Sequence, residues 1–452
     1  MVGKKTPIGR DSVSEQKSKI LERVKKEEIS FIDLMFSDLS GQLKCVTISP
    51  RELENCLEDG KWFDGSSVEG FTRIHESDML LIPDSTTYIM LPWPRHGKNA
   101  ARIICDVFEP NKIPYEGAPR NILRRISETS EAKGWFYKVG PEIEFFLFGS
   151  KEEGDYYDRA SYFDFSPRDL GIDIRAVIVS TLEGLGIQVG MTHHECGPSQ
   201  HEIDIEYSNV LTSADNIMVA KQAIKTVASN IDLYASFMPK PRTGVAGSGM
   251  HTHQSIFNNN RKNLFHDDDD PYQLSTLAYH FMGGQLEYIR EMSAILCPTV
   301  NSYKRLGGFE APVYICWGQR NRSALIRVPR YGKNRQESAR LELRCPDPSC
   351  NPYITFAVML AAGMKGIDKK IEPPEPVEED VFDFDDAKLA QFYIKSMPSD
   401  LGEALDEFEQ SKFIKDCLGE QAFNKYLGLK RAEWSEFKRS VTDWERMYYI
   451  DL

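Results

Sequence analysis

Two glutamates stand two positions apart in a segment that is otherwise apolar. Residues 140–148 read GPEIEFFLF, and aromatic and β-branched residues after a Gly-Pro break predict a strand. Side chains alternate along a strand, so Glu142 and Glu144 share one face. Two buried neighbouring carboxylates are costly unless a positive group lies between them, and a divalent metal ion is the simplest such group. An edge strand with two solvated glutamates is the alternative that this segment alone leaves open.

Two further segments carry functional groups among small or apolar residues. Residues 193–202 (HHECGPSQHE) place Glu195 and Glu202 on either side of a Gly-Pro turn, and this hairpin-like spacing allows the two glutamates to face each other. Residues 247–255 (GSGMHTHQS) begin as a glycine-rich loop and continue as a strand that places three polar side chains on one face: His251, His253 and Ser255.

A fourth segment, residues 340–344 (RLELR), alternates charge with leucine, so that Arg340 and Arg344 flank Glu342 on one face. Together the four segments offer five glutamates, histidine and arginine. This mixture suits hard cations that bind a nucleotide's phosphates. A structural zinc site would need cysteine clusters, and the sequence has no Walker, Rossmann or kinase motif. We therefore expect a phosphate-transfer site of another kind.

The charge of the chain is unevenly distributed. The net charge is −13 over 452 residues, which argues against general nucleic-acid binding. Residues 301–345 contain ten basic and three acidic residues, a local charge of +7. A cationic stretch in an anionic protein indicates a site for a small anion such as phosphate or carboxylate. An RNA-binding stripe is the competing interpretation, and the few aromatic residues in this stretch argue against it.

Length and composition predict a two-domain cytoplasmic protein. A chain of 452 residues is long for one core. The sequence contains no apolar run of membrane-spanning length, and residues 1–10 lack the apolar core of a signal peptide. Nine scattered cysteines without a framework favour reduced thiols. We expect neither a membrane nor a nucleic acid as a partner.

Local patterns predict the elements that must position these side chains. A capping box at residues 12–15 predicts a helix to about residue 26, followed by strands at 31–36 and 43–48 and a polar loop at 63–67. After a domain boundary near residue 112, further helices are expected at 215–229, 271–296 and 351–367 and along 401–446. Residues 373–386 form an acidic, proline-rich loop.

These motifs, in this order, resemble those of type I glutamine synthetases over nearly the whole chain. Further matching motifs are FDGSS at 63–67, NSYKRL at 301–306 and NRS at 321–323. The resemblance implies an α+β fold: an N-terminal β-grasp domain (1–112) and a C-terminal glutamine synthetase catalytic domain (113–452). In the latter a curved antiparallel sheet forms a split barrel between subunits. Two six-membered rings would make a homo-dodecamer.

The activity implied by the resemblance is ATP-dependent ligation of ammonia to L-glutamate through a γ-glutamyl phosphate intermediate. Two Mg²⁺ or Mn²⁺ ions would serve each site, one on Glu144, Glu195 and Glu202, the other on Glu142, His251 and Glu342. Matching ATP-binding positions are Tyr207, His253, Ser255, Arg327, Lys333 and Arg340. Matching glutamate- or ammonium-binding positions are Ser67, Tyr162, Gly247, Arg305 and Arg344. The matching catalytic residues are Asp64, Glu310 and Arg322, with Asp64 supplied by a neighbouring subunit.

Three departures from the family pattern lie close to the substrate. Ala246 replaces the usual asparagine, the flap segment at 307–308 is one residue shorter than usual, and residues 329–340 are a few longer. These changes leave two alternatives open: a ligase for a larger amine such as a polyamine, and a regulatory oligomer with little activity. All six metal positions and Asp64 are present, which argues against loss of catalysis.

Regulation can also be predicted from the resemblance. Phe382 occupies the position of the tyrosine that some members adenylylate, and since it has no hydroxyl we expect no adenylylation there. Arg73 and Glu433 match a pair tied to feedback inhibition in the branch that is not adenylylated. We therefore expect control by a metabolite or a regulatory protein.

Overall fold

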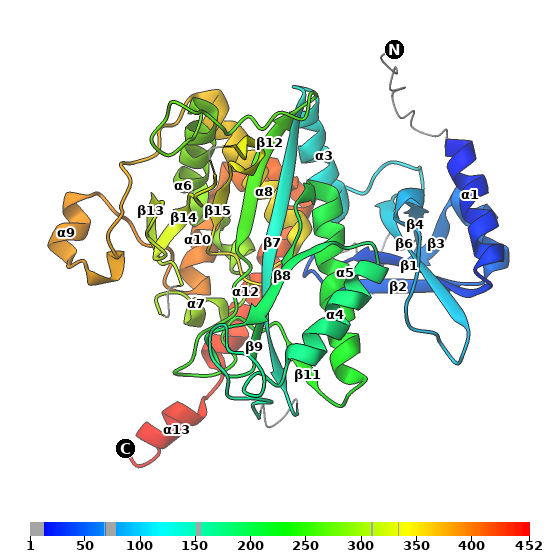
Figure 1. Ribbon diagram of the computed structural model, residues 1–452, viewed down its shortest axis with the longest axis horizontal. Coiled ribbons are helices and arrows are strands. Elements are labelled where there is room, and N and C mark those ends of the chain that lie inside the picture. The colour runs from blue at the N-terminus through cyan, green and yellow to red at the C-terminus, as the bar shows by residue number, and fades with distance from the viewer. Residues whose placement is uncertain (1–12, 67, 69–77, 151–154, 309–310, 333) are drawn as a thin grey trace.

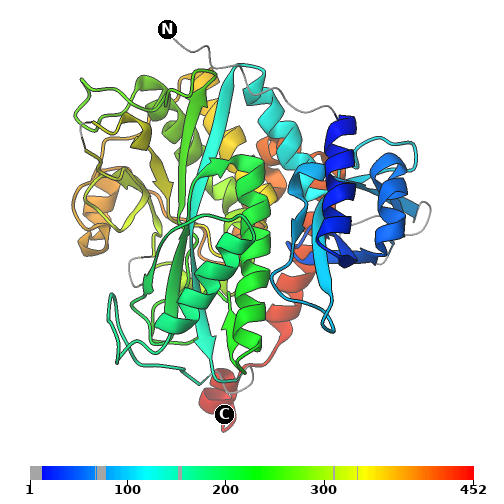
Figure 2. The ribbon, with the colours of Figure 1, turned by 45° about the vertical axis from the view of Figure 1, so that its right-hand side comes forward.

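The computed structural model describes residues 13–66, 68, 78–150, 155–308, 311–332 and 334–452. Figures 1 and 2 show a small sheet domain, which carries the N-terminus, beside a larger domain of sheet and helices. The predicted division at 112/113 falls in the connection between the last strand of the small domain, which ends at Phe108, and helix α3, which begins at Pro119. Within the described residues, no helix is long and apolar enough to cross a membrane.

In the described residues, the small domain consists of a six-stranded sheet with two α-helices. Its strands are β1 (Ile29–Ser37), β2 (Leu43–Ile48), β3 (Lys61–Asp64), β4 (Asp78–Pro83), β5 (Ile89–Met90) and β6 (Asn99–Phe108), and its helices are α1 (Val13–Lys26) and α2 (Leu53–Asp59). The strand order is β2-β1-β6-β4-β3, with β1 and β6 parallel. The predicted helix and the first two predicted strands are confirmed. The predicted loop at 63–67 is wrong at its start, because Phe63 and Asp64 pair with β4 and Phe63 packs on Phe36 with ring centroids 5.0 Å apart.

A long strand, β7 (Trp135–Phe148), forms the centre of the larger domain's sheet. The order is β13-β14-β15-β12-β7-β9-β8, and β7 is antiparallel to both β9 and β12. The bounds are β8 (Val189–His194), β9 (Gln200–Ile205), β12 (Thr252–Asn258), β13 (Tyr314–Gly318), β14 (Ala324–Arg327) and β15 (Leu341–Leu343). Two short strands, β10 (Ser208–Asn209) and β11 (Tyr234–Ser236), also pair with β7. The predicted strand at 140–148 is confirmed as the second half of β7.

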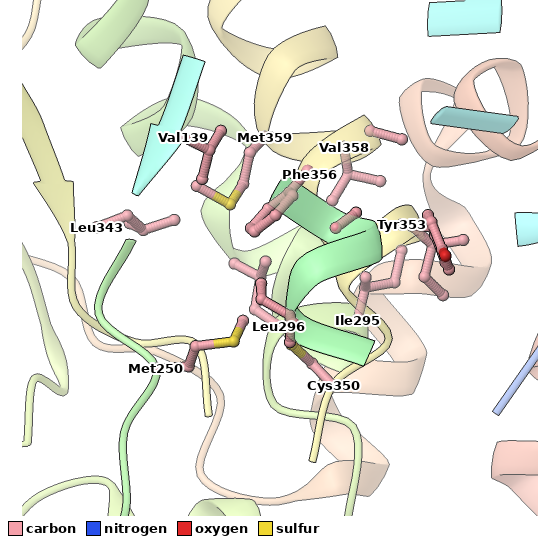
Figure 3. Packing of buried hydrophobic residues seen from close by; sticks show 14 of the residues in the cluster. Val139, Met250, Ile295, Leu296, Leu343, Cys350, Tyr353, Phe356, Val358 and Met359 are labelled. Carbon is pink, nitrogen blue, oxygen red and sulfur yellow. The ribbon is translucent and has the colours of Figure 1, made fainter. Parts of the chain in front are cut away.

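Helices cover one face of this sheet. They include α3 (Pro119–Glu131), α4 (Ile172–Gly184), α5 (Val210–Ser229), α6 (Thr276–Leu296) and α8 (Pro352–Lys369). Figure 3 shows Val139 of β7 and Leu343 of β15 packed beside Phe356 and Met359 of α8. The side chains of β7 therefore alternate between two environments. Val139, Ile143 and Phe145 belong to the core, and Glu142 and Glu144 face away from it.

Helix α7 (Ser302–Arg305) lies between α6 and β13. The chain after α8 is mostly helical, with α9 (Asp386–Gln391), α10 (Leu401–Gln410), α11 (Lys412–Leu418), α12 (Glu420–Arg439) and α13 (Asp443–Tyr449). The predicted helical run 401–446 is broken at three points. Ser411 caps α11, Gly419 has φ +84°, and Thr442 opens α13 with a capping box. The N-cap Ser275 likewise starts α6 later than predicted.

Candidate active site

A cavity of about 400 Å³ lies on the face of the sheet that the helices leave uncovered. Its lining comes from β7, the β8–β9 hairpin, the segment before β12, and β15. All six residues that the sequence predicted as metal ligands line it: Glu142, Glu144, Glu195, Glu202, His251 and Glu342. The strand pairing explains why residues 200 positions apart in sequence converge, because β9, β7, β12 and β15 are successive neighbours in one sheet.

On one side of the cavity, carboxylates of β7 and β9 stand opposite each other. The register pairs Glu144 with Glu202 and Glu142 with Asp204. Burial and the charge of Glu195 raise the pKa of Glu144 to about 8. Burial and the charge of Glu144 raise the pKa of Glu202 well above its usual range. These raised pKa values mean that the protein places too little positive charge beside these carboxylates to stabilise all of them in the ionised form.

On the other side, two histidines approach Glu142. His253 Nε2 lies 2.6 Å from Glu142 Oε1, and His251 Nδ1 lies 3.1 Å from Oε2. Burial by itself would raise the pKa of Glu142, but the charge of His253 and the hydrogen bonds from both histidines outweigh it and hold the pKa well below its usual range. The two glutamates of β7 therefore have opposite electrostatic environments.

Glu342 is held by two arginines. Arg344 Nη1 donates to Oε1 at 2.5 Å, and Arg327 Nη1 donates to Oε2 at 2.9 Å. The charge of Arg344 outweighs the effect of burial and lowers the pKa of Glu342. Both arginines line the cavity beside Glu342, so they can contact an anion that a cation on Glu342 brings in.

Sequence reasoning missed two polar groups of this surface. His193 Nε2 lies 3.0 Å from Glu202 Oε1, and ligand atoms of His193, Glu195 and Glu202 all lie within 4.8 Å of one another. In the register Glu202 stands opposite His193 rather than opposite Glu195, although both glutamates line the cavity. Burial and the charge of Glu142 raise the pKa of Asp204 to about 7. Two-residue alternation with Glu195 and Glu202 was the signal that would have found them.

A second cavity of about 400 Å³ adjoins the first and shares Glu142 with it. Four of the predicted nucleotide positions line it: Tyr207, His253, Ser255 and Arg340. Arg340 Nε donates to His253 Nδ1 at 3.3 Å. Arg327, the fifth described nucleotide position, lines the first cavity instead. The two cavities therefore form neighbouring compartments that meet at Glu142.

Predicted glutamate- and ammonium-binding positions also line the first cavity. They include Tyr162, Gly247 and Arg344, and the predicted catalytic residue Arg322 and the departure Ala246 line it as well. Arg305 also lines it, but its guanidinium donates to three backbone carbonyls that follow β15: those of Arg344, Cys345 and Pro346. In this arrangement Arg305 holds the chain that leaves β15 in place.

Asp64 does not line this cavity in its own chain. It ends β3, an edge strand of the small sheet, and Figure 1 shows β3 on the side of that domain away from β7. Its side chain is exposed and accepts a hydrogen bond from the backbone of Ser66 at 2.9 Å. Glu433, on α12, pairs with Lys430 at 2.9 Å and is not part of the cavity lining. Four other predicted site residues lie outside the described residues: Ser67, Arg73, Glu310 and Lys333.

Sequence-family models match both domains of the chain. The model described as the glutamine synthetase β-grasp domain matches residues 28–110, and that of the glutamine synthetase catalytic domain matches residues 116–449. The chain belongs to the glutamine synthetase family. The glutamine synthetases of Methanosarcina mazei and Thermotoga maritima are each 46% identical to it. The first alignment covers 96% of this chain and 98% of the relative, and the second covers 95% and 98%.

Solved structures agree with this assignment. The Plasmodium falciparum glutamine synthetase has a TM-score of 0.86 at 25% identity and covers 99% of this chain and 100% of its own. A complex named GmaS with ADP has a TM-score of 0.86 at 30% identity, with coverage of 96% and 99%. The predicted α+β fold is confirmed, with a β-grasp domain and a curled half-barrel sheet in the catalytic domain.

The family assignment fixes the activity. This enzyme is an ATP-dependent ligase that makes glutamine, and its substrates are small molecules. No comparison favours the alternative of a larger amine acceptor or that of an inactive regulatory oligomer. The described residues include candidate metal sites, because ligand atoms of Glu142, Glu202 and His251 lie within 4.8 Å of one another, as do those of the hairpin cluster around His193.

Proposed function

We propose that two divalent cations, Mg²⁺ or Mn²⁺, bind the first cavity on separate sets of side chains. Glu144, Glu195 and Glu202 would hold one ion, and Glu142, His251 and Glu342 the other. The donors fit hard cations, since five of the six are carboxylates. The raised pKa values of Glu144 and Glu202 and the buried Oδ1 of Asp204, which has no hydrogen-bond partner among the described residues, indicate a surface that lacks positive charge.

ATP would occupy the second cavity, with its phosphates directed toward Glu142. Tyr207, His253 and Ser255 would contact the nucleoside, and Arg327, Lys333 and Arg340 the phosphates. Arginine suits this task because its planar fork binds oxyanions with two hydrogen bonds. Bound cations would supply electrostatic stabilisation of the phosphoryl group during transfer. The side chains would align the terminal phosphate with the carboxylate of glutamate.

Glutamate would lie on the Arg322 side of the first cavity, in contact with Gly247, Arg305 and Arg344. Its γ-carboxylate oxygen forms a bond to the terminal phosphorus of ATP as the bond to ADP breaks, which gives γ-glutamyl phosphate and ADP. Ammonia then attacks the acyl carbon, and phosphate leaves. Arg322 would neutralise the charge that develops on the acyl phosphate.

The attacking species must be uncharged NH₃, so a base near an ammonium pocket is required. Asp64, with Ser67 and Tyr162, would bind ammonium and take its proton, and Glu310 would close over the intermediate. Since Asp64 lies on an edge strand of the small sheet and does not line the cavity of its own chain, we propose that it serves a neighbouring subunit.

This sharing of sites would need an assembly in which residues 1–112 of one chain meet residues 113–452 of the next. We propose that this assembly is a dodecamer of two six-membered rings and that it is located in the cytoplasm. The C-terminal segment supports an extended assembly, because Trp444, Met447 and Ile450 are 54%, 72% and 71% exposed and exposed apolar patches of this kind mark interaction surfaces. We further propose regulation through Arg73 and Glu433 by a metabolite or protein, without adenylylation at Phe382.

The observation that carries this proposal is the opposite environment of Glu142 and Glu144 on one face of β7. The test is phosphate release by the purified protein with glutamate, Mg²⁺-ATP and either ammonium or a polyamine such as putrescine. We expect release with ammonium and formation of glutamine. Release only with the polyamine would overturn the proposed acceptor, and absence of release with both would favour a regulatory role.

A further inference from the structure

The β8–β9 hairpin has a second polar layer on the face that points away from the cavity. His193 and Glu202 face the cavity, so alternation turns their neighbours His194 and His201 to the opposite face. Both of these histidines are fully buried, and their rings lie 4.9 Å apart, edge to face. Most buried polar groups have hydrogen-bond partners, so the partners of these two imidazoles indicate what this layer does.

His194 links the hairpin to Asp158. Its Nε2 lies 2.9 Å from Asp158 Oδ1, and its Nδ1 lies 2.7 Å from the backbone carbonyl of Glu195. Asp158 Oδ1 also accepts a hydrogen bond from the Ser199 backbone at 3.0 Å, and Ser199 Oγ accepts one from the Asp158 backbone at 2.9 Å. One buried carboxylate thus fixes both sides of the turn between Glu195 and Glu202.

His201 is fixed from the other side by helix α4. Arg175 Nη1 lies 2.9 Å from His201 Nδ1, and the same guanidinium forms two hydrogen bonds to Asp169, at 3.1 and 2.5 Å. Gly171, just before the helix, lies against the ring, since a Cβ at this position would be 2.4 Å from His201 Cε1. The ring is therefore confined between an arginine and the helix N-terminus.

The same network reaches the loop that carries Tyr162. The backbone N–H of Phe163 donates to the carbonyl of His194 at 3.1 Å. The rings of Tyr162 and Phe163 pack edge-on against His193, with centroids 5.4 and 4.6 Å apart. Since Asp158 lies in the segment that leads into this loop, it connects the loop to the hairpin at two points.

We propose that Asp158 is a positioning residue. Through His194 and Ser199 it holds Glu195, Glu202 and the Tyr162 loop in one arrangement around the cation on Glu144. This inference rests on the proposed function, because it takes Glu195 and Glu202 as metal ligands. Groups that orient metal ligands typically change metal affinity 10- to 100-fold when they are lost.

The same three side chains could be considered as ligands themselves, because ligand atoms of Asp158, His194 and His201 lie within 4.8 Å of one another. Two contacts favour a network without a metal. The Arg175 guanidinium already contacts His201, and a second cation beside it would be repelled. Both ring nitrogens of His194 already have oxygen partners.

The test is titration of the full-length protein with Mn²⁺, followed by the electron paramagnetic resonance signal of the free ion, in wild type and Asp158→Asn. We expect one of the two binding steps to weaken about 10- to 100-fold and the other to stay unchanged. The KM for ammonium should rise, and the KM for ATP should not. A variant that only folds less well would affect both binding steps and both KM values alike, so a change in one of each indicates a positioning role.

Asp33→Asn is the matched control. Asp33 is also a fully buried carboxylate in an ion pair, with Arg95, but it lies in the small domain on β1. Its substitution should leave both Mn²⁺ binding steps unchanged. If Asp158→Asn does not fold, Ser199→Ala removes the two hydrogen bonds between Ser199 Oγ and the Asp158 backbone and should weaken the same binding step alone.

The outcomes separate the inference from the proposed function. Wild-type protein that binds no Mn²⁺ would overturn both. Normal Mn²⁺ binding in wild type together with unchanged affinity in Asp158→Asn, or in Ser199→Ala where Asp158→Asn does not fold, would overturn the positioning role alone. A tightly held transition metal in the purified protein that is lost in Asp158→Asn would also overturn it, because Asp158 would then be a ligand.

Discussion

At the scale of single residues, Glu142 and Glu144 differ in their neighbours although they extend from one face of β7 into one cavity. Glu142 contacts His251 and His253. Glu144 accepts hydrogen bonds from Gln200 Nε2 at 2.9 Å and from the Gly249 backbone at 3.0 Å, and it lies opposite Glu202. The first carboxylate is therefore neutralised by the protein, while the second depends on what binds the cavity.

This difference predicts a pH-dependent effect of the metal on stability. Without metal, the pKa of Glu144 is about 8 in the folded protein, compared with an ordinary value of 4.5. Between these values the folded state keeps a proton that the unfolded state loses, so the stability of the metal-free protein falls as pH rises through this window. A bound cation displaces the proton from Glu144 and so removes this loss of stability at higher pH. We expect the gap in melting temperature between Mg²⁺-loaded and metal-free protein to widen from about pH 5 to about pH 8.

Differential scanning calorimetry over this pH range measures the gap. Glu144→Gln is the control, since an amide has no proton to release, and its gap should change less with pH. A gap in the wild-type protein that stays constant across the range would contradict the assignment of Glu144 as an ion-binding group.

At the scale of elements, the active face depends on how closely helices α6 and α8 pack behind the sheet. Glycines allow this approach. A Cβ at Gly284 would lie 2.2 Å from the carbonyl oxygen of Ala362 and 2.6 Å from Gly366 Cα. Phe356 and Met359 of α8 then reach Val139 of β7 (Figure 3), so the position of β7 follows from the position of α8.

We predict that Gly284→Ala lowers the free energy of unfolding by about 1–3 kcal/mol or more, because the added methyl group overpacks a contact with backbone atoms. Gly428→Ala is the matched control on α12, where, apart from adjacent residues and the nearby backbone of the helix itself, no atom of the described residues lies within 4 Å of the position that the added methyl group would take. This change should stabilise by about 0.4–1 kcal/mol. Urea unfolding measures both, and equal effects in the two variants would contradict the packing account.

The sequence predicted most of these elements, but it did not predict how they pair. Alternation in residues 140–148 was sufficient to place Glu142 and Glu144 on one face, since side chains two positions apart point to the same face of a strand whichever strands it pairs with. The pairing of Glu202 with Glu144 depends on the register of β7 with β9, which is set by contacts far apart in sequence. Alternation with Glu195 and Glu202 would have placed His193 and Asp204 on the same faces, but which residues stand opposite them follows only from the registers of β9 with β8 and β7.

Helix ends were predicted less well for a related reason. The amphipathic pattern from 401 to 446 is continuous enough to indicate one helical region. The helices end or begin at Ser411, Gly419 and Thr442. Whether such a residue interrupts a helix depends on how the flanking helices pack. Phe63 and Asp64 were assigned to a loop because their neighbours are polar, and pairing with β4 overrode this composition.

At the scale of the whole molecule, the proposed site is complete only when two chains meet. The cavity is in the larger domain. Asp64 ends β3, an edge strand of the small sheet, and β3 lies on the side of that domain away from β7 (Figure 1). A closed ring in which each small domain contacts the next large domain satisfies this geometry for every chain.

We predict that two inactive variants restore activity when they assemble together. Asp64→Ala lacks the base, and Glu202→Gln lacks a proposed metal ligand, so each variant by itself should be inactive. In mixed oligomers refolded at a one-to-one ratio, about a quarter of the sites would combine two intact halves, as closed ring symmetry requires. Glutamine formation measures this recovery. A mixture no more active than its components would show that Asp64 acts within its own chain.

The central claim is that two cations bind separate ligand sets on one sheet face, and counting Mn²⁺ ions per chain tests it most directly. We predict two ions per chain in the wild-type protein and one in Glu342→Gln, with glutamine formation reduced by at least about 100-fold, since loss of a direct ligand should exceed the loss of an orienting group. The remaining ion should be the one whose affinity depends on Asp158. One ion per chain in the wild type, or two in Glu342→Gln, would contradict the account.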